Sequence, residues 1–147
     1  MISFIVYGKP VAQPRMGERG GLKTTQYGGV YKEKYDPAAK KKESFRVKCL
    51  EIRPDRPFDC PIKVVIDFYF SRPKDHYRSV KKRPVLKDDA PVHYAVRKRN
   101  DIDNLAKFTL DALNGIFWLD DGIIVKGTFM KHYTEKLPYT EIKIIEL

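Results

Sequence analysis

Six charged side chains lie between residues 101 and 121, and five of them, set in two groups, are of the types and in the places that could hydrolyse a phosphodiester. Asp101 and Asp103 are separated by one residue, Lys107 follows one helical turn later, and Asp120 and Asp121 come after an apolar stretch. Carboxylate oxygens are the ligands that Mg²⁺ and Mn²⁺ prefer, and such an ion activates water and neutralises phosphate charge. A lysine beside it can stabilise the transition state. We therefore expect Asp101, Asp103 and Asp121 to bind Mg²⁺, or Mn²⁺ in its place, with Asp120 as a further candidate ligand.

Two different elements must position these side chains. The apolar pattern predicts a helix over 103–114 that ends at Asn114-Gly115. Asp120-Asp121-Gly122 is typical of a turn before a strand. If that strand packs against the helix, the turn can bring Asp121 back to the first acid pair.

Each of these residues also has an ordinary structural explanation. Aspartate is favoured at helix starts, so Asp101 and Asp103 can be helix caps, and Asp120-Asp121-Gly122 can be a turn alone. Lys107 and Asp111 can form a solvated stripe of ion pairs with Asp103, worth about 0.2–0.5 kcal/mol per pair. The metal interpretation is favoured because the acids gather in the one acidic part of a basic chain.

The net charge is divided unevenly along the chain. The 147 residues contain 29 Lys and Arg against 19 Asp and Glu, which gives a formal net charge of +10. Residues 9–48 carry 11 basic and 4 acidic side chains, and residues 72–99 carry 10 and 3. Residues 100–147 carry 5 basic and 8 acidic side chains. Two segments of +7 and an acidic one of −3 indicate a nucleic-acid partner with a cation between it and the acids.

Two basic segments, at about 9–35 and 72–99, contain glycines or prolines and show little periodicity, so we expect long loops. The second exceeds the usual length of a structureless loop, and we expect little order there without a partner. Basic residues interleaved with tyrosines suit phosphate contact and base stacking; the alternative is a basic surface that only keeps the chain in solution. The candidate DNA contacts are Lys9, Arg15, Arg19, Lys23, Lys81, Lys82, Arg83, Arg97, Lys98 and Arg99.

The remaining patterns predict one α+β domain over residues 1–147. Alternation predicts strands, and helical spacing with Asp36-Pro37 at the start and Pro54 after the end predicts a further helix. The order is strand, helix, strand, helix, strand, strand, which suits a mixed β-sheet packed by two main helices. The predicted elements besides the helix over 103–114 are strands at 2–7, 62–70, 123–130 and 140–147 and a helix at 37–53.

Several classes of protein are disfavoured. No apolar run reaches the roughly 20 residues that cross a bilayer, and the first residues lack a secretion signal. Cys49 and Cys60 do not have zinc-ligand spacing, and His76, His93 and His132 are scattered, so we expect two reduced thiols and no structural zinc. We expect a soluble protein of the cytoplasm of a bacterial or phage-infected cell, with no membrane partner and no small-molecule cofactor.

The acidic segment also resembles a known family. Residues 101–107 (DIDNLAK), 110–115 (LDALNG) and 118–121 (WLDD) are similar to the signature of the RusA family of Holliday junction resolvases. Gly8-Lys9-Pro10 with Gln13-Pro14-Arg15, and the closing strand pair, are similar to the family's ends. Only the segment 72–99 has no obvious counterpart.

The resemblance implies a homodimeric, Mg²⁺-dependent endodeoxyribonuclease of phage or prophage origin, which resolves four-way DNA junctions by paired symmetric nicks in recombination and repair. Asp101, Asp103 and Asp121 take the catalytic carboxylate positions of the family, and Lys107 takes that of its essential lysine. A two-fold dimer would present two identical sites to two opposed strands. Two alternatives remain: a non-cleaving phage DNA-binding accessory or regulatory protein of the same fold, and a nuclease that acts mainly on forks or flaps.

Overall fold

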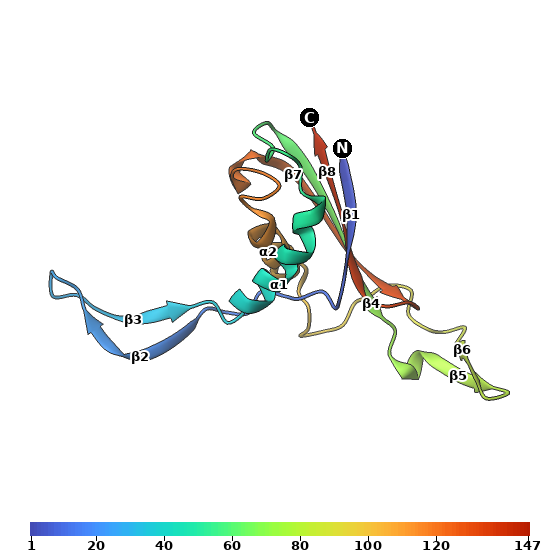
Figure 1. The fold of residues 1–147 in the computed structure, drawn as a ribbon. Helices are drawn as coiled ribbons and strands as arrows, with labels where there is room; N and C mark the ends of the chain where they lie inside the picture. The colour runs from blue at the N-terminus through green and yellow to red at the C-terminus, as the bar shows by residue number, and fades with distance from the viewer.

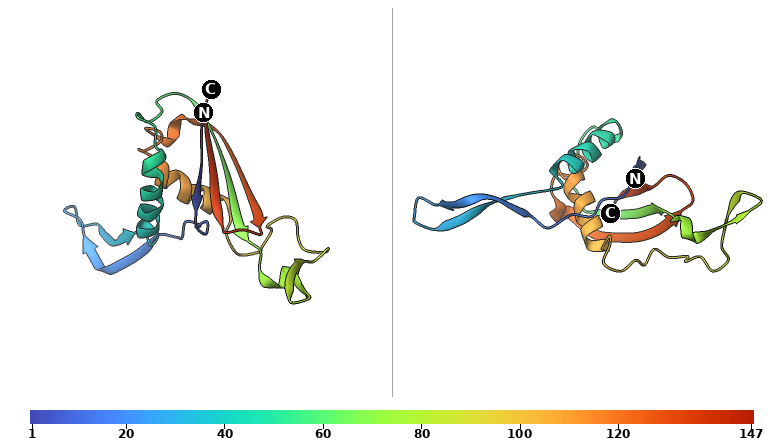
Figure 2. Two further views of the ribbon diagram at one scale, coloured as in Figure 1. Left: turned by 45° about the vertical axis from the view of Figure 1, so that its right-hand side comes forward. Right: turned by 90° about the horizontal axis from the view of Figure 1, so that it is seen from below.

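The computed structural model describes residues 1–147. Its body is a mixed four-stranded sheet with two helices against one face (Figures 1 and 2). β4 and β7 are parallel and the other neighbouring strands are antiparallel. The single α+β domain predicted from the sequence is therefore confirmed. In order across the sheet, the strands are β1 (Ile2–Tyr7), β8 (Tyr139–Glu146), β4 (Ile62–Ser71) and β7 (Ile124–Thr134).

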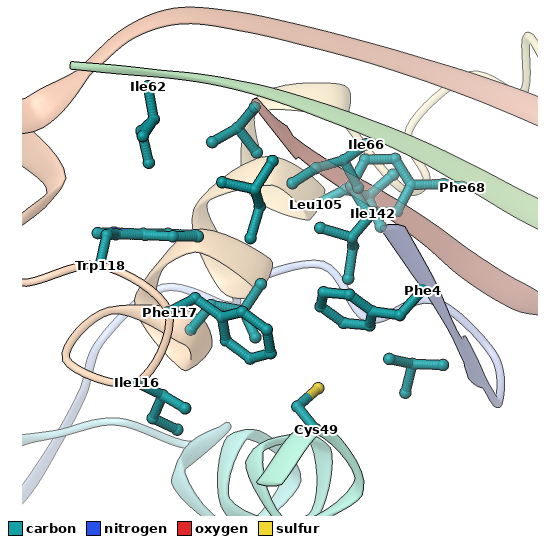
Figure 3. Packing of buried hydrophobic residues seen from close by; sticks show 14 of the residues in the cluster. Phe4, Cys49, Ile62, Ile66, Phe68, Leu105, Ile116, Phe117, Trp118 and Ile142 are labelled. Carbon is teal, nitrogen blue, oxygen red and sulfur yellow. The ribbon is translucent and has the colours of Figure 1, made fainter. Parts of the chain in front are cut away.

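The core lies between the sheet and the helices (Figure 3). β4 buries every second side chain from Ile62 to Phe70, because alternate residues of a strand point to the same face. The helix α2 (Ile102–Leu113) buries one face against them, whereas α1 (Ala39–Cys49), which continues into the short η1 (Leu50–Ile52), fully buries only Cys49. The core thus holds α2 firmly on the sheet.

The segment after α2 folds back against the end of that helix. Gly115 adopts a left-handed φ of +77°, and its N–H donates to the Trp118 carbonyl at 2.8 Å. The indole of Trp118 is fully buried, and Phe58 hydrogen-bonds to Phe117 and Leu119 on either side of it. A short η3 turn (Asp121–Ile123) then leads into β7. The Asn114-Gly115 helix end predicted from the sequence is confirmed.

Both basic segments contain β-hairpins where loops are expected. β2 (Gly17–Thr24) pairs with β3 (Val30–Tyr35), and β5 (Tyr77–Val80), which follows η2 (Lys74–His76), pairs with β6 (Arg83–Leu86). The two hairpins project from opposite sides of the body (Figures 1 and 2). The loop prediction is wrong for these residues, because a hairpin that buries neither face needs no alternation of apolar and polar side chains.

The start of α1 also differs from the prediction. The sequence places Pro37 at the first helical position, but the helix begins at Ala39. The Asp36 carboxylate accepts a hydrogen bond from the Ala38 N–H at 2.8 Å, which closes a turn before the helix. Neither helix is long and apolar enough to cross a membrane.

Candidate active site

Asp101 and Asp103 lie at the start of α2 with unpartnered carboxylates. Both are exposed, and the Asp101 side chain makes no capping hydrogen bond. Neither residue is in any of the ion pairs of the chain. The capping explanation therefore does not hold for Asp101. The positive end of the helix dipole favours negative charge at this position, and both carboxylates are free to bind a cation.

A residue with a left-handed backbone conformation directly precedes this acid pair. Asn100 adopts a left-handed φ of +52°, which is uncommon for residues other than glycine. Its side-chain amide donates to the Tyr94 hydroxyl at 2.7 Å, and Lys131 Nζ donates to its carbonyl at 3.1 Å. Tyr94 in turn stacks on Phe70 at 4.2 Å between ring centroids. These contacts fix the backbone just before Asp101 to β4 and β7. No pattern in the sequence indicated them.

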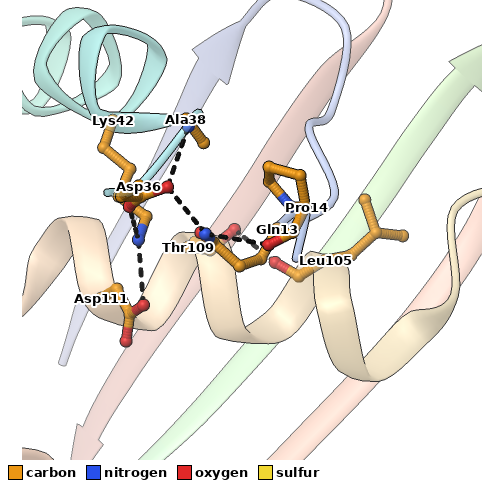
Figure 4. A network of polar contacts seen from close by, with 8 residues as sticks. All are labelled: Gln13, Pro14, Asp36, Ala38, Lys42, Leu105, Thr109 and Asp111. Carbon is orange, nitrogen blue, oxygen red and sulfur yellow. Dashed lines mark hydrogen bonds and ion pairs between the residues drawn. The ribbon is translucent and has the colours of Figure 1, made fainter. Parts of the chain in front are cut away.

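Lys107 is the exposed cation one turn after Asp103. The stripe of ion pairs that would explain it structurally does not form, because Asp111 pairs with Lys42 of α1 at 3.0 Å. Lys42 also pairs with Asp36 at 2.8 Å (Figure 4), and Lys107 has no ion pair. The ammonium group of Lys107 is therefore available to an incoming anion.

The Lys42 network connects three parts of the chain. Asp36 accepts hydrogen bonds from Lys42 and from Gln13 Nε2, the latter at 2.9 Å (Figure 4). The Gln13 N–H donates to the Asn104 carbonyl of α2 at 2.9 Å. The hydrogen bond from Lys42 lowers the pKa of Asp36 to about 2. Burial by itself lowers the pKa of Lys42, but its bonds to Asp36 and Asp111 outweigh that effect and raise it. Asp36 therefore stays charged and paired with Lys42 at neutral pH.

A polar cavity of about 650 Å³ adjoins this network. Arg15 and Lys107, two of the predicted functional residues, both line it. Asp36 and Asp111 line it too, but Lys42 neutralises part of their charge. The cavity thus combines unpaired cations with compensated acids, which suits a phosphate group.

Asp120 and Asp121 lie at the opposite end of α2. Asp120 Oδ1 accepts from the Gly122 N–H at 2.7 Å, and Asp121 Oδ1 accepts from the Trp118 indole N–H at 2.7 Å. A helix of 12 residues is about 18 Å long, so Asp121 is far from Asp101 and Asp103 in the same chain. The chain contains no group of three His, Cys, Asp or Glu side chains placed to hold a metal ion. The expected return of Asp121 to the acid pair does not occur within one chain, because the segment after α2 is pinned beside the helix end.

Comparison with known proteins gives the family. Residues 8–145 match the family Endodeoxyribonuclease RusA. The chain belongs to the RusA family. The uncharacterized protein YqaN of Bacillus subtilis (strain 168) is 31% identical over 148 residues, which cover 99% of this chain and 96% of YqaN. The resemblance seen in residues 101–121 is therefore confirmed, and membership of the RusA family implies nuclease activity.

The structure divides the candidate DNA contacts of this RusA chain into two kinds. On the first hairpin, Arg19 and Lys23 both pair with Glu33 at 2.9 Å. Hydrogen bonds from Lys23 and then Arg19 lower the pKa of Glu33 to about 2. The other candidates are exposed and in no ion pair: Lys9 after β1, Arg15 before β2, Lys81, Lys82 and Arg83 at the β5–β6 turn, and Arg97, Lys98 and Arg99 before Asn100.

The turn between β5 and β6 presents its cations in an unusual backbone conformation. Lys81 and Lys82 have left-handed φ values of +48° and +63°. Asn and Gly are the residues that favour such a turn. Two lysines here place adjacent unpaired charges at the end of the hairpin.

Proposed function

We propose that this RusA-family chain is a divalent-metal-dependent endodeoxyribonuclease that resolves four-way DNA junctions by paired symmetric nicks. One observation carries the proposal. Asp101 and Asp103 lie at the exposed start of α2 with the exposed Lys107 one turn further on, and none of the three is in an ion pair with a protein group. Unpaired carboxylates next to an unpaired lysine suit phosphodiester hydrolysis better than they suit helix stability.

The donor chemistry at this end of α2 fits Mg²⁺ or Mn²⁺, which take hard oxygen ligands. Asp101 and Asp103 would hold the ion. When bound, it would supply a water of lowered pKa and neutralise charge on the phosphate. Lys107 donates hydrogen bonds to the oxygens of the scissile phosphate as negative charge develops on them. Arg15, on the same cavity, binds a phosphate of the same strand.

We propose further that a second copy of the chain completes each site with its Asp121. If a two-fold axis lays the two α2 helices antiparallel, the start of each helix lies beside the end of the other. Asp121 uses Oδ1 for the Trp118 indole and has Oδ2 left for a cation. Asp120 holds the turn through the Gly122 N–H, so its part is to position Asp121. Two such sites would cut two opposed strands of one junction.

The primary test is nicking of a synthetic four-way junction with Mg²⁺ by the wild type and by Asp103→Asn. We expect nicks in opposed strands from the wild type and none from the variant, while junction binding is kept. Wild-type binding without cleavage under any divalent cation would favour the non-cleaving accessory protein. Faster cleavage of forks or flaps than of junctions would contradict junction resolution.

Mixed dimers test whether the site is shared between two copies. Asp103→Asn and Asp121→Asn chains, co-expressed with different tags and purified by both tags, would form one site with both defects and one with neither. We expect the mixed dimer to make single nicks, although each homodimer is inactive. An inactive mixed dimer would contradict the shared site and leave junction cleavage by the wild type unaffected.

The β5–β6 hairpin supplies a DNA contact in this proposal. Its anchor is an aromatic cluster in which Arg72 lies over the Tyr133 ring at 4.9 Å and His76 meets that ring edge-on at 5.0 Å. From this anchor the hairpin carries the unpaired Lys81, Lys82 and Arg83 away from the body (Figure 1). Unpaired cations contribute most to DNA affinity, because they give up no ion pair within the protein when they contact a phosphate.

A further inference from the structure

We propose that Lys42 is a positioning residue that reserves Asp111 and thereby leaves Lys107 free for the DNA phosphate. The inference rests on the proposed nuclease function. It assigns a role to a lysine of α1 whose position within a run of three lysines, 40–42, gives no sign of it.

The spacing on α2 makes the free state of Lys107 unexpected. Asp103, Lys107 and Asp111 are each one turn apart, and opposite charges at this spacing attract one another on a helix surface. Asp111 is nevertheless paired across the helix interface, with Lys42 Nζ at 3.0 Å from its Oδ2. The carboxylate that could neutralise Lys107 from the next turn is thus held by a residue of the other helix.

Lys42 is well fixed for this role. Its side chain is only 15% exposed, and its ammonium group bonds two carboxylates at 2.8 and 3.0 Å. Its backbone N–H donates to the Ala38 carbonyl at 2.9 Å, and Asp36 is itself held by Gln13 and by the Ala38 N–H. When a lysine has two carboxylate partners in fixed positions, the two charge-assisted hydrogen bonds offset the conformational entropy that its side chain loses in one rotamer.

Removing Lys42 would change the charge that Lys107 meets. Asp111 would lose its partner and could turn to Lys107, one helical turn away. Asp36 and Asp111 would also leave uncompensated negative charge on the cavity that Lys107 and Arg15 line, which repels a phosphate. Both effects lower the rate of nicking, and both disappear if Asp111 is neutral.

The experiment compares four variants by single-turnover nicking of the four-way junction, with thermal melts of each. We expect Lys42→Met to be about tenfold slower than wild type, the double variant Lys42→Met/Asp111→Asn to recover to within about threefold, and Lys42→Arg to stay near wild type. Lys40→Met removes the same charge from an exposed site on the same helix and is expected to stay within about twofold. A merely structural Lys42 would leave the double variant as slow as Lys42→Met, and that result, or full activity of Lys42→Met, would overturn the proposal.

A crystal structure of the Lys42→Met variant tests the role of Lys42 independently of nuclease activity. In a crystal structure of Lys42→Met we expect Lys107 Nζ to lie within about 4 Å of the Asp111 carboxylate, the ordinary limit of an ion pair. Lys107 unpaired in that variant would overturn the role of Lys42 even if the wild type cuts junctions. A wild type that cuts no branched DNA would instead end the proposed function, and the Lys107–Asp111 pair would still establish what Lys42 does.

Discussion

The two ends of α2 carry the same kind of acid and use it differently. At the start of the helix, Asp101 and Asp103 are exposed and in no ion pair. Beyond the end, Asp120 and Asp121 each accept a hydrogen bond at 2.7 Å, from the Gly122 N–H and the Trp118 indole. The first pair makes no side-chain hydrogen bond or ion pair within the fold, whereas the second holds a turn against the buried Trp118. Residue type alone therefore does not distinguish a free ligand from a structural acceptor.

The same distinction separates the two hairpins. The cations of the β2–β3 hairpin include Arg19 and Lys23, which share Glu33, whereas Lys81, Lys82 and Arg83 of the β5–β6 hairpin are in no ion pair. An exposed charge that already has a partner must give it up to bind a ligand. The unpartnered charges at the start of α2 and at the β5–β6 turn should therefore contribute more to DNA cleavage and binding than the partnered ones.

The largest expected effect is the loss of junction nicking when an acid without a partner is substituted. Asp103→Asn should reduce the rate of junction nicking by at least about 100-fold, because it removes one cation ligand, and should leave the melting temperature within about 1 °C. Nicking assays and thermal melts check this. Asp88→Asn, at an exposed acid of the 72–99 segment, is the matched control and should change neither quantity. A lowered melting temperature for Asp103→Asn would mean that this acid is part of the fold after all.

Substitution of Asp121, which has a hydrogen-bond partner, should lower the stability of the fold. Asp121→Ala leaves the indole N–H of the fully buried Trp118 without its acceptor, which should cost about 1–3 kcal/mol and lower the melting temperature by several degrees. Asp121→Asn keeps an acceptor oxygen and should melt near the wild type. Denaturant unfolding measures the difference, and Asp103→Ala is the matched control at the other end of α2. Equal stability of the two alanine variants would remove the contrast between the ends.

The hairpins should differ in the salt dependence of DNA binding. Lys81→Ala/Lys82→Ala/Arg83→Ala removes three unpaired cations, and the slope of log K against log salt should fall by about 0.9 for each phosphate that these cations neutralise in the wild type. Arg19→Ala/Lys23→Ala removes two cations that already share Glu33, so the slope should fall by less per charge. Binding of both variants to one junction across a salt series measures this. The same change per charge in both would show that partnering within the hairpin does not matter.

Sequence patterns revealed the body and the chemistry but not the network. Alternation from Ile62 to Phe70 and the apolar face of α2 predict the sheet and helix because each buries one face, and burial leaves a period in the sequence. The hairpins bury no face, so their sequences show no such period. Lys42 is one of three consecutive lysines, and only the packing of α1 on α2 brings it to Asp111. The separation of Asp121 from Asp101 likewise follows from how the chain turns after α2.

The smallest expected effect concerns the acid dependence of stability through Asp36. Its pKa is lowered from 3.8 to about 2 chiefly by the hydrogen bond from Lys42, so the folded state binds its proton less readily than the unfolded state. The stabilisation is fully present above about pH 4 and disappears as the pH falls through 2. Urea unfolding of wild type and Lys42→Met between pH 7 and pH 2 should therefore show a difference that is constant down to about pH 4 and then closes. Lys40→Met should show no such closing difference, because Lys40 is in no ion pair. A difference that persists at pH 2 would mean that Lys42 stabilises the fold by packing its methylenes. The ion pairs of Lys42 would then contribute little to the free energy of unfolding, and a charge with a partner would not be a structural charge here.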